Sequence, residues 1–599
     1  MSRINDFSFK SATVNGTGSA SANSLLMQAI FRMGIPVTGK NIFPSNIQGL
    51  PTWYEVRVSG DGYTGRPAAI DLIVALNPST YAQDIAAVRS GGYVVYDSSW
   101  PLDAKYHRAD VTFLGVPLGD LCREAFTGDR DRVLLRNVAY AGVLTALLQI
   151  DQQLIEGMLN EKYGRKKALL DANHRAIRLG YDYAREHFDC PLPFHCEPMD
   201  GTRDSILMDG NAACALGALY AGATVGAWYP ITPSTSLMES FKAFCQEYRV
   251  DKKTGLKRYC ILQAEDELSA AGMVLGAGWM GARSFTCTSG PGISLMQEFL
   301  GLAYYTELPG VFFNVQRAGP ATGMPTRTQQ ADLMLMAYAS HGDTKHIMLF
   351  PADPGECFEL AVTAFDVAER FQTPVFVVTD LDIGMNDWLV PRFQWDDSYV
   401  PDRGKVLDAD ALEKVQKFFR YVDADGDGIA ARTLPGVSGK GAYFTRGSGH
   451  DRFGAYTEDA AAYQDVVDRI KRKFETAARE LPKPAYTLQD GADVGIVFVG
   501  SPDAAVREAV DRLREQGIRA DVMRIRSFPF APEVTEFLER YTSVFVVEMN
   551  RDAQLRSLLA IETGTPRDRM ISVLDYAGQP IAADTLVSAL TSHLEGAAR

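Results

Sequence analysis

Apolar residues along the chain form two patterns: short continuous runs, and stretches in which apolar positions recur every three or four residues. Continuous runs predict buried strands at residues 71–76, 93–96, 259–262, 284–288, 311–315, 374–379, 494–499, 520–525 and 543–548. Alternation predicts another strand at residues 7–14. Helical spacing follows it at Leu25, Leu26, Ala29, Ile30 and Met33, and predicts further helices at residues 81–89, 463–479 and 502–516. Strands that alternate with helices are typical of parallel sheets, so the predicted fold class is α/β.

Shifts in composition divide this pattern into three α/β domains, in keeping with a length of 599 residues, too long for one core. The first spans residues 1–190 and ends in a proline-rich linker. The second spans residues 203–400, and an irregular, glycine-rich connecting segment follows at 401–489. The third spans residues 490–599.

Charge and cysteine content exclude several classes of protein. The net charge of -14 argues against a nucleic-acid binder and a polybasic membrane-surface protein. The apolar segment 138–150 is too short to cross a bilayer, and the N-terminus lacks the apolar core of a signal peptide. None of the 8 cysteines forms a C-x-x-C pair, so spacing predicts neither an iron-sulfur cluster nor a zinc site. We therefore expect a soluble, cytoplasmic protein with reduced cysteines.

The hexapeptide Tyr-Pro-Ile-Thr-Pro-Ser at residues 229–234 is the most distinctive turn in the chain. Its two prolines fix the backbone on either side of Thr232, whose hydroxyl is thereby held rigidly. A helix follows, in which Ser236 and Glu239 have the spacing of a capping box. From spacing alone, an ordinary capped turn explains this stretch as well as a ligand site does.

The hexapeptide resembles the signature of the alpha subunits of 2-oxoacid:ferredoxin oxidoreductases. These thiamine diphosphate enzymes decarboxylate a 2-oxoacid, make an acyl-CoA and pass two electrons to ferredoxin. The domain order is similar too: a gamma-type domain, a pyrimidine-binding domain and a transketolase C-terminal-like domain, with the weakest similarity at residues 100–190. A gamma-then-alpha fusion with a separate beta chain resembles the 2-oxoglutarate type (2-oxoglutarate synthase) more than the single-chain pyruvate type.

Glu267 is the predicted cofactor-activating residue. A thiamine cofactor needs a carboxyl group against the ring nitrogen of its aminopyrimidine, and a carboxylate on a wall of small residues can meet that flat ring. Glu265, Asp266 and Glu267 could instead simply complement a helix dipole. The resemblance points to Glu267, with Glu265 as the fallback, and implies cofactor contacts from Pro230 and Ile231.

Arg317 is the predicted ligand of the substrate carboxylate. It closes an apolar strand, where ligands of parallel sheets bind, and a guanidinium grips a carboxylate with two hydrogen bonds. By position alone, a surface arginine on a loop is about as probable. The segment that follows resembles the family's R-G-G-P-S-T-G-x-P-T loop, although Ala318 and Ala321 replace its first glycine and its serine. The resemblance implies that Thr232 and Thr326 also contact the 2-oxoacid.

The distal carboxylate of a dicarboxylic substrate needs a second donor. We expect His450, in a segment that resembles a histidine-containing stretch of these subunits, or Lys40. A histidine in a glycine-rich loop is, however, more often structural or solvated.

The turn containing Gly16 and Gly18 is a candidate phosphate cradle at a helix N-terminus. As a dinucleotide fingerprint it fails, because Ser21 stands where the third glycine belongs, which disfavours a dinucleotide-dependent dehydrogenase. A tight strand-to-helix turn is the plain alternative. The resemblance implies a contact with the phosphate of coenzyme A.

Metal-site spacings in the chain are incomplete. The acidic run at 423–428 starts like a calcium loop, but Leu434 occupies position twelve. The tripeptide Gly-Asp-Gly, which opens a thiamine diphosphate–magnesium site, occurs at residues 60–62 and 426–428. Neither copy has the downstream asparagine of such a site. We therefore predict no metal site on this chain. The resemblance then implies a beta subunit that supplies the diphosphate and Mg²⁺ site and a [4Fe-4S] cluster.

The expected assembly is a heterotetramer, a dimer of alpha–beta pairs. Ferredoxin, itself acidic, is expected to dock on the partner chain. Pyruvate, branched-chain or aryl 2-oxoacids remain alternative substrates, and a non-catalytic subunit of such a complex remains an alternative role.

Overall fold

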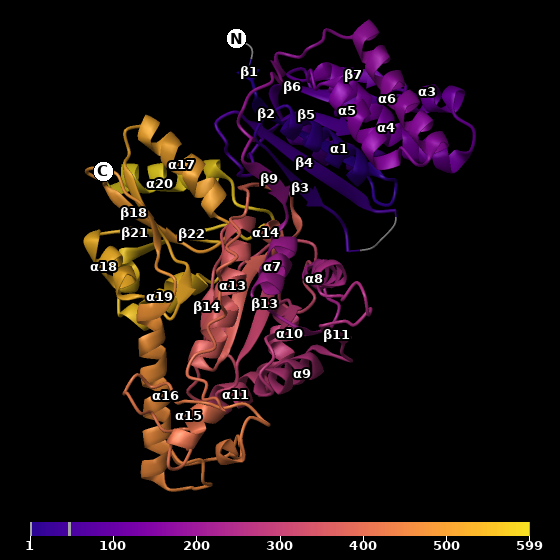
Figure 1. The fold of residues 1–599 in the computed structure, drawn as a ribbon. Helices are drawn as coiled ribbons and strands as arrows, with labels where there is room; N and C mark the ends of the chain where they lie inside the picture. The colour runs from indigo at the N-terminus through magenta and orange to yellow at the C-terminus, as the bar shows by residue number, and fades with distance from the viewer. Residues whose placement is uncertain (1–2, 46–48, 598–599) are drawn as a thin grey trace.

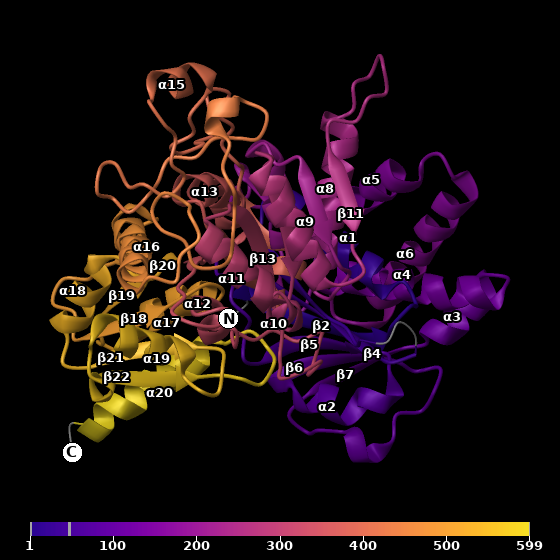
Figure 2. The ribbon, with the colours of Figure 1, turned by 90° about the horizontal axis from the view of Figure 1, so that it is seen from below.

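The computed structural model describes residues 3–45 and 49–597, which form three α/β regions and a connecting segment. Figure 1 shows the N-terminal region and the C-terminal region on either side of the upper end of the middle region, with the connecting segment at the opposite end. Figure 2 shows the N-terminal and C-terminal sheets on opposite sides of the middle elements. The α/β fold class predicted from the apolar pattern is confirmed.

The N-terminal region contains a 6-stranded sheet of order β3-β4-β2-β5-β6-β7, in which β2, β5, β6 and β7 are parallel. Its helices pack mainly on one face, over a core that includes Phe9, Leu26 and Leu144, whereas α2 covers the other face. Its strands are β1 (Arg3–Ile4), β2 (Asp6–Val14), β3 (Val37–Ile42), β4 (Pro51–Ser59), β5 (Ile70–Ala75), β6 (Val88–Asp97), β7 (Thr112–Val116) and β8 (Phe194–His195). Its helices are α1 (Ser19–Arg32), α2 (Tyr81–Ala86), α3 (Leu118–Ala125), α4 (Asp129–Leu147), α5 (Gln152–Tyr163) and α6 (Lys167–His187).

The middle region contains a 7-stranded sheet of order β11-β10-β12-β13-β15-β14-β20 with buried helices on both faces. Its β20 comes from the C-terminal region and pairs antiparallel with β14, which joins the two regions. The strands of the middle region are β9 (Ser205–Met208), β10 (Val225–Trp228), β11 (Cys260–Gln263), β12 (Ser284–Thr288), β13 (Gly310–Gln316), β14 (Ile347–Leu349), β15 (Pro374–Asp380) and β16 (Trp388–Pro391). Of these, β9 and β16 form a separate antiparallel pair. Its helices are α7 (Gly210–Tyr220), α8 (Thr235–Tyr248), α9 (Glu267–Trp279), α10 (Gly290–Leu295), α11 (Gln297–Thr306), α12 (Leu333–Ala337), α13 (Pro354–Phe371) and α14 (Leu381–Met385).

The C-terminal region contains a 5-stranded sheet of order β17-β19-β18-β21-β22. Its strands are β17 (Ala485–Thr487), β18 (Val494–Phe498), β19 (Ala520–Arg524), β20 (Ser527–Phe528), β21 (Val544–Glu548) and β22 (Met570–Leu574). Its helices are α17 (Asp503–Glu515), α18 (Pro532–Arg540), α19 (Gln554–Thr563) and α20 (Ala583–Ala597).

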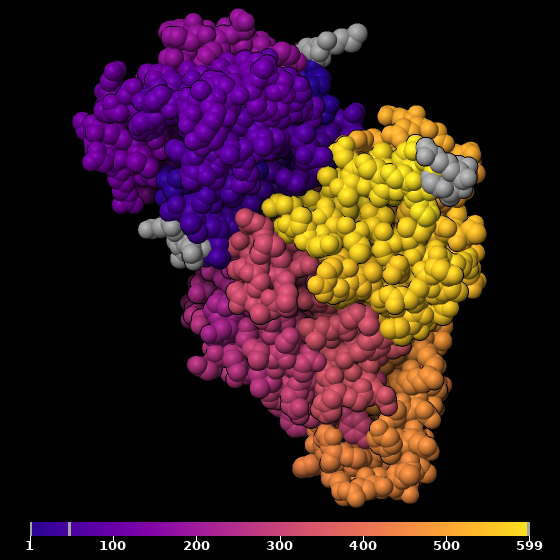
Figure 3. All heavy atoms as spheres, turned by 180° about the vertical axis from the view of Figure 1, so that it is seen from behind, coloured from indigo at the N-terminus to yellow at the C-terminus, as the bar shows by residue number. Residues whose placement is uncertain are grey.

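The connecting segment holds α15 (Ala409–Lys414) and the long α16 (Ala460–Glu480), which is amphipathic and packs its apolar side on the middle region. Buried charges fix it there, because Glu307 accepts hydrogen bonds from Arg469 at 3.1 Å and Lys473 at 3.0 Å. Figure 3 shows this segment at the end of the molecule farthest from the N-terminal region.

Polar contacts fasten the N-terminal region to the middle region along β3, β4 and α14. The Lys40 ammonium lies 2.5 Å from Asp382, and both side chains are buried. The Tyr54 hydroxyl donates to Asp387 at 2.9 Å. These contacts bring the start of α1 close to the edge of the middle sheet.

Two local predictions are wrong. Ser236 lies inside α8 and does not cap it; its hydroxyl accepts a hydrogen bond from Asn211 instead. The helix predicted at 81–89 ends at Ala86, and β6 then runs through the Gly-Gly pair at 91–92, because pairing with β5 and β7 outweighs the local glycine signal. Among the described residues, no helix combines the length and apolarity needed to span a membrane.

Candidate active site

Three of the predicted site residues meet where strands of the middle sheet end. Thr232 lies in the turn after β10, Glu267 begins α9 after β11, and Arg317 directly follows β13. Because β10 pairs with β11 and β12, and β12 pairs with β13, these strand ends are neighbours. The carboxyl ends of parallel strands are where α/β proteins bind ligands.

Arg317 is held by the hexapeptide turn. Its Nη1 donates to the carbonyl oxygen of Thr232 at 2.7 Å, and its Nε has no hydrogen-bond partner among the described residues. The side chain is 9% exposed, and burial lowers the pKa of its guanidinium, while Asp332 and Glu267 oppose that shift. A buried guanidinium with free N–H groups is suited to a carboxylate ligand.

Glu267 is buried, with 5% exposure, whereas Glu265 is exposed. Asp266 caps α9 by accepting from the backbone N–H of Ser269 at 2.7 Å, which leaves the Glu267 carboxylate available. The Glu267 side chain lies against Gly292, where an added Cβ would come within 2.8 Å of its Cγ. A carboxylate on a glycine wall fits the edge of a flat aminopyrimidine ring, so this residue fits the implied cofactor.

The hexapeptide turn presents the Thr232 hydroxyl. Ile231 accepts backbone hydrogen bonds from Ser234 and Thr235, and Asn211 donates to the Pro233 carbonyl at 2.8 Å. In the part of the chain that the structure describes, the Thr232 hydroxyl has no hydrogen-bond partner, and Pro230 is exposed. The turn therefore fixes the backbone while its polar side chain stays open to a ligand.

The loop after Arg317 closes on itself. Ala318 donates to the carbonyl of Arg327 at 2.9 Å, and Arg327 donates to the Thr326 hydroxyl at 3.2 Å. Arg327 also donates to the carbonyl of Phe43 at 2.9 Å, so the loop touches the N-terminal region. Of the two departures from the family loop, Ala318 is buried in this pairing, and Ala321 adopts a positive φ of 57°.

Asp332 is a site residue that sequence reasoning missed. Its carboxyl group accepts from Asn314 Nδ2 at 3.1 Å, and burial raises its pKa to about 6, although Asn314 and Arg317 oppose the rise. An aspartate directly before an apolar helix is usually interpreted as an N-cap, and no other signal in the sequence distinguishes Asp332 from an ordinary cap.

Gly16 and Gly18 border a hollow of about 430 Å³ between the N-terminal region and α14. Both glycines have a φ of 84°, and Gly18 directly precedes α1, whose first N–H groups receive no side-chain cap. Phe43 of the N-terminal region and Met385 of α14, in the middle region, also line this hollow.

His450 does not join the other predicted residues. It is buried, its ring stacks on Tyr421 at 4.1 Å, and it contacts Tyr305, with ring centroids 4.9 Å apart. Tyr305 precedes β13 whereas Arg317 follows it, so His450 lies near the amino ends of the strands and Arg317 at their carboxyl ends. Lys40, the other candidate for the distal carboxylate, is already paired with Asp382.

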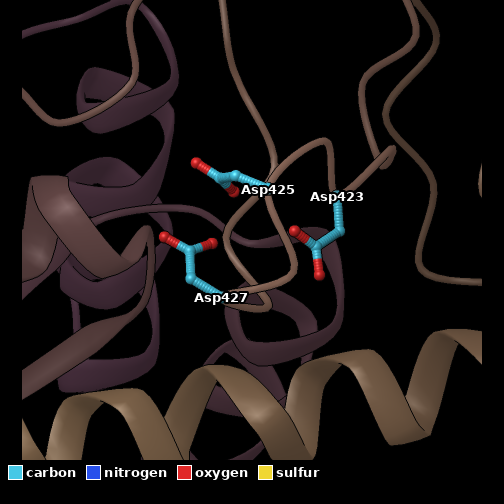
Figure 4. Close-up of side chains that lie close together, drawn as sticks. All are labelled: Asp423, Asp425 and Asp427. Atoms are coloured by element: carbon cyan, nitrogen blue, oxygen red, sulfur yellow. The ribbon is translucent and has the colours of Figure 1, made fainter.

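The acidic run in the connecting segment carries its own cation. Figure 4 shows the carboxylates of Asp423, Asp425 and Asp427 gathered around one loop. The Lys405 ammonium lies 2.6 Å from Asp425 and 2.8 Å from Asp427. This ammonium offsets the negative charge that would otherwise attract a metal ion.

Sequence profiles of known families match most of the chain. Residues 216–389 match the family described as pyruvate flavodoxin/ferredoxin oxidoreductase, thiamine diP-bdg. Residues 8–183 match pyruvate ferredoxin/flavodoxin oxidoreductase, and residues 492–580 match the pyruvate:ferredoxin oxidoreductase core domain II.

Whole-chain relatives agree with these matches. Subunit alpha of 2-oxoacid:ferredoxin oxidoreductase 2 from Aeropyrum pernix is 30% identical, over 97% of this chain and 96% of its own length. The 2-oxoglutarate synthase subunit KorA of Methanothermobacter thermautotrophicus is 35% identical, over 58% of this chain and 88% of its own. A solved 2-oxoglutarate:ferredoxin oxidoreductase from Magnetococcus marinus, with 2-oxoglutarate, coenzyme A and succinyl-CoA bound, has a TM-score of 0.89 and 27% identity, covering 98% of this chain and 99% of that one. The chain therefore belongs to the alpha subunits of the 2-oxoacid:ferredoxin oxidoreductases, enzymes that work in a complex with other subunits.

Proposed function

We propose that this chain, paired with a beta subunit, catalyses the oxidative decarboxylation of 2-oxoglutarate with coenzyme A to succinyl-CoA and CO₂, with reduction of ferredoxin. The observation that carries the proposal is the similarity, over nearly the whole of both chains, to the Magnetococcus marinus enzyme described with these ligands. The KorA relatives support the same substrate. The pyruvate names of the matching families make pyruvate the second candidate.

Glu267 is the proposed contact to the cofactor. Thiamine diphosphate, when bound, supplies the electron sink that decarboxylation of a 2-oxoacid requires. The buried Glu267 carboxylate would hold the aminopyrimidine, with Pro230 and Ile231 beside it. Glu267 thus orients the ring and controls its protonation.

Arg317 is the proposed anchor of the oxoacid. Arg317, whose Nε is unpartnered, is bonded to the turn that carries Thr232, and Thr326 lies in the loop that follows Arg317. A bidentate guanidinium fixes the direction of a carboxylate as well as its position. Since neither His450 nor Lys40 is free at this edge, we do not propose either as the distal carboxylate ligand.

Coenzyme A is proposed to bind at the hollow beside Gly16 and Gly18. The start of α1 offers N–H groups to a phosphate, and the hollow extends to Met385 at the edge of the middle region. A long, anionic ligand placed there would point its thiol end towards the strand ends of the middle sheet.

A beta subunit is proposed to cover α9 and its neighbours. Apolar side chains are exposed on adjoining elements of the middle region: Leu262, Met273, Met280, Leu295 and Leu302. Such exposure beside a half-formed site is typical of a protein interface. We propose that this partner carries the Mg²⁺–diphosphate site and the [4Fe-4S] cluster, and that two alpha–beta pairs associate. We also propose that ferredoxin docks on the partner, because this chain is acidic, with a net charge of -14, and would repel an acidic protein.

The test is anaerobic viologen reduction by the purified complex across a panel of 2-oxoacids, with and without coenzyme A. CoA-dependent reduction, strongest with 2-oxoglutarate, is the expected result. A preference for pyruvate would keep the reaction and replace the substrate. Failure to reduce viologen, with thiamine diphosphate and the cluster present in the complex, would overturn the catalytic proposal in favour of a non-catalytic subunit.

A further inference from the structure

A hairpin formed by residues 249–258 projects from the edge of the middle sheet. It joins α8 to β11, the edge strand of the 7-stranded sheet, and Figure 2 shows it extending beyond α8 and β11, away from the body of the molecule. Val250 pairs antiparallel with Lys257, and the backbone N–H of Asp251 donates to the carbonyl of Leu256 at 2.9 Å. At its base, Arg249 donates to the carbonyl of Leu219 in the middle region at 2.7 Å. These bonds give the hairpin a defined conformation.

This basic hairpin lies in a chain that is acidic as a whole. The chain has a net charge of -14, yet residues 249–258 include five basic residues and one acid. That acid, Asp251, accepts from the backbone N–H groups of Lys253 at 2.9 Å and Thr254 at 2.8 Å, so its carboxylate serves the turn. Four cations are exposed and have no ion-pair partner among the residues that the structure describes: Lys252, Lys253, Lys257 and Arg258. The outer part of the hairpin therefore carries positive charge that nothing in this chain neutralises.

The side chains of the basic hairpin suit an acidic protein that binds and then leaves. Unpaired surface cations attract an oppositely charged partner and raise its rate of association. Lysine is depleted in stable protein interfaces, and ordering its long side chain costs entropy, so three lysines among the four cations favour a transient partner over a permanent subunit. Leu256, 63% exposed near the tip, adds an apolar contact.

The basic hairpin borders the surface that we assign to the beta subunit. It leads directly into β11, whose Leu262 is one of the exposed apolar side chains of that surface, and Glu267 follows at the start of α9. We propose that the basic hairpin is a docking element for ferredoxin, which attracts this acidic carrier and contacts its rim while the beta subunit provides the rest of the docking face. The hairpin thus supplies an attraction that the acidic remainder of the chain does not. This inference rests on the proposed reduction of ferredoxin.

A second basic cluster on the chain provides a matched comparison. Arg165, Lys166 and Lys167 lie in the turn between α5 and α6 of the N-terminal region, and all three are exposed. Within residues 3–45 and 49–597, they too have no ion-pair partner. Reversing three charges in either cluster changes the net charge of the chain equally, so the two variants separate local docking from a general effect of charge.

The first experiment compares two electron acceptors on the purified alpha–beta complex. A purified acidic [4Fe-4S] ferredoxin requires a docking face, whereas methyl viologen, a small dication, does not. The variant Lys252→Glu/Lys253→Glu/Lys257→Glu should raise the KM for ferredoxin about tenfold at low ionic strength, with kcat and the rate of viologen reduction within about twofold of the wild type. At about 0.5 M salt the difference from the wild type should largely disappear, because salt screens exposed charges.

The control variant is Arg165→Glu/Lys166→Glu/Lys167→Glu in the turn between α5 and α6. It should keep the wild-type KM for ferredoxin at every salt concentration, because this cluster lies on a different region of the chain. A similar rise in KM from both variants would show that ferredoxin responds to the net charge, which contradicts the proposal.

Carbodiimide crosslinking tests the same contact without turnover. The reagent joins a lysine amine to a carboxylate that touches it, and mass spectrometry identifies the joined residues. In the wild-type complex mixed with ferredoxin we expect Lys252, Lys253 or Lys257 joined to ferredoxin carboxylates at low salt, and a loss of these products at high salt. Lys166 and Lys167 should give none.

The outcomes separate this inference from the proposed function. An equal loss of ferredoxin and viologen reduction in the hairpin variant, or its failure to bind the beta subunit, would assign the hairpin to the alpha–beta interface and overturn the inference. Ferredoxin crosslinks that avoid the hairpin lysines would overturn it as well. A wild-type complex that reduces neither acceptor would contradict the proposed function, and the crosslinks would still decide whether the hairpin binds ferredoxin.

Discussion

The guanidinium of Arg317 and the backbone of Thr232, separated by 85 positions in the chain, are joined by a hydrogen bond of 2.7 Å from Nη1 to the carbonyl oxygen. This bond ties the end of β13 to the turn after β10. It also uses a backbone acceptor, so the Thr232 hydroxyl stays available. The arginine is thereby oriented before a ligand binds, which reduces the entropy that binding costs.

Arg317→Lys tests this orientation. Lysine keeps the charge but loses the planar fork and the bond to Thr232, so we expect the KM for 2-oxoglutarate to rise by about 10- to 100-fold with a smaller effect on the KM for coenzyme A. Steady-state viologen assays measure both constants. Arg203→Lys, on an exposed arginine, is the control. Equal rises in both KM values would argue against a specific role for Arg317 in oxoacid binding.

Glu267→Gln tests the cofactor contact. Glutamine keeps the shape but cannot share a proton in the same way, so we expect activity to fall by about 10²- to 10⁴-fold while the complex still assembles and retains thiamine diphosphate. Viologen reduction and cofactor content are measured on the same sample. The paired variant Glu265→Gln changes an exposed acid two residues away and should keep wild-type activity. The reverse result would move the role to Glu265.

Gly292→Ala tests the glycine wall. The added Cβ would lie 1.9 Å from Thr288 Oγ1 and 2.8 Å from Glu267 Cγ, so the carboxylate must move. We expect at least a tenfold loss of activity, because small misplacements of a catalytic group are costly, together with a loss of stability of about 1–3 kcal/mol from overpacking. Activity and thermal unfolding are the readouts. Gly157→Ala, with open space around its Cβ position, should change neither by much.

The buried Glu55 predicts an acid-sensitive N-terminal region. Burial alone would raise the pKa of Glu55, but Lys10 at 2.9 Å and Arg66 at 2.7 Å outweigh it and lower the pKa to about 2. Because the folded pKa lies below the ordinary value of 4.5, the stabilisation is full above pH 4.5 and is lost as the pH falls towards 2. The shift corresponds to about 3 kcal/mol.

Hydrogen exchange of the β2 and β4 amides, measured from pH 7 down to pH 3 and corrected for intrinsic rates, reports this loss. Glu55→Gln should already be destabilised at pH 7, by about 3–5 kcal/mol, since it leaves the buried Lys10 and the half-buried Arg66 without their counter-ion. Glu161→Gln, which removes an exposed partner of Arg32, is the control and should have little effect. If protection in the wild type is independent of pH between 4.5 and 3, the assignment to Glu55 is wrong.

The sequence alone determined the α/β class and most of the buried strands, because a strand covered on both faces must be apolar throughout. The sequence also indicated that Thr232, Glu267 and Arg317 follow strands, and parallel strands bring their carboxyl ends together. Their roles in binding came from the family resemblance and stay predictions. Prolines around Thr232 and small residues after Glu267 are local features, readable without any contact map.

Only the tertiary structure decided which polar residues share the site. His450 and Arg317 both look available in sequence, yet β13 separates them, and His450 is packed against Tyr421. Lys40 looks like a free cation until Asp382 meets it across the two regions. Asp332 looks like a helix cap, yet its carboxyl group makes no capping bond and accepts from Asn314 of β13 instead. Each of these outcomes depends on long-range partners, and the free energy of a buried charge is set by the partners that the fold brings to it.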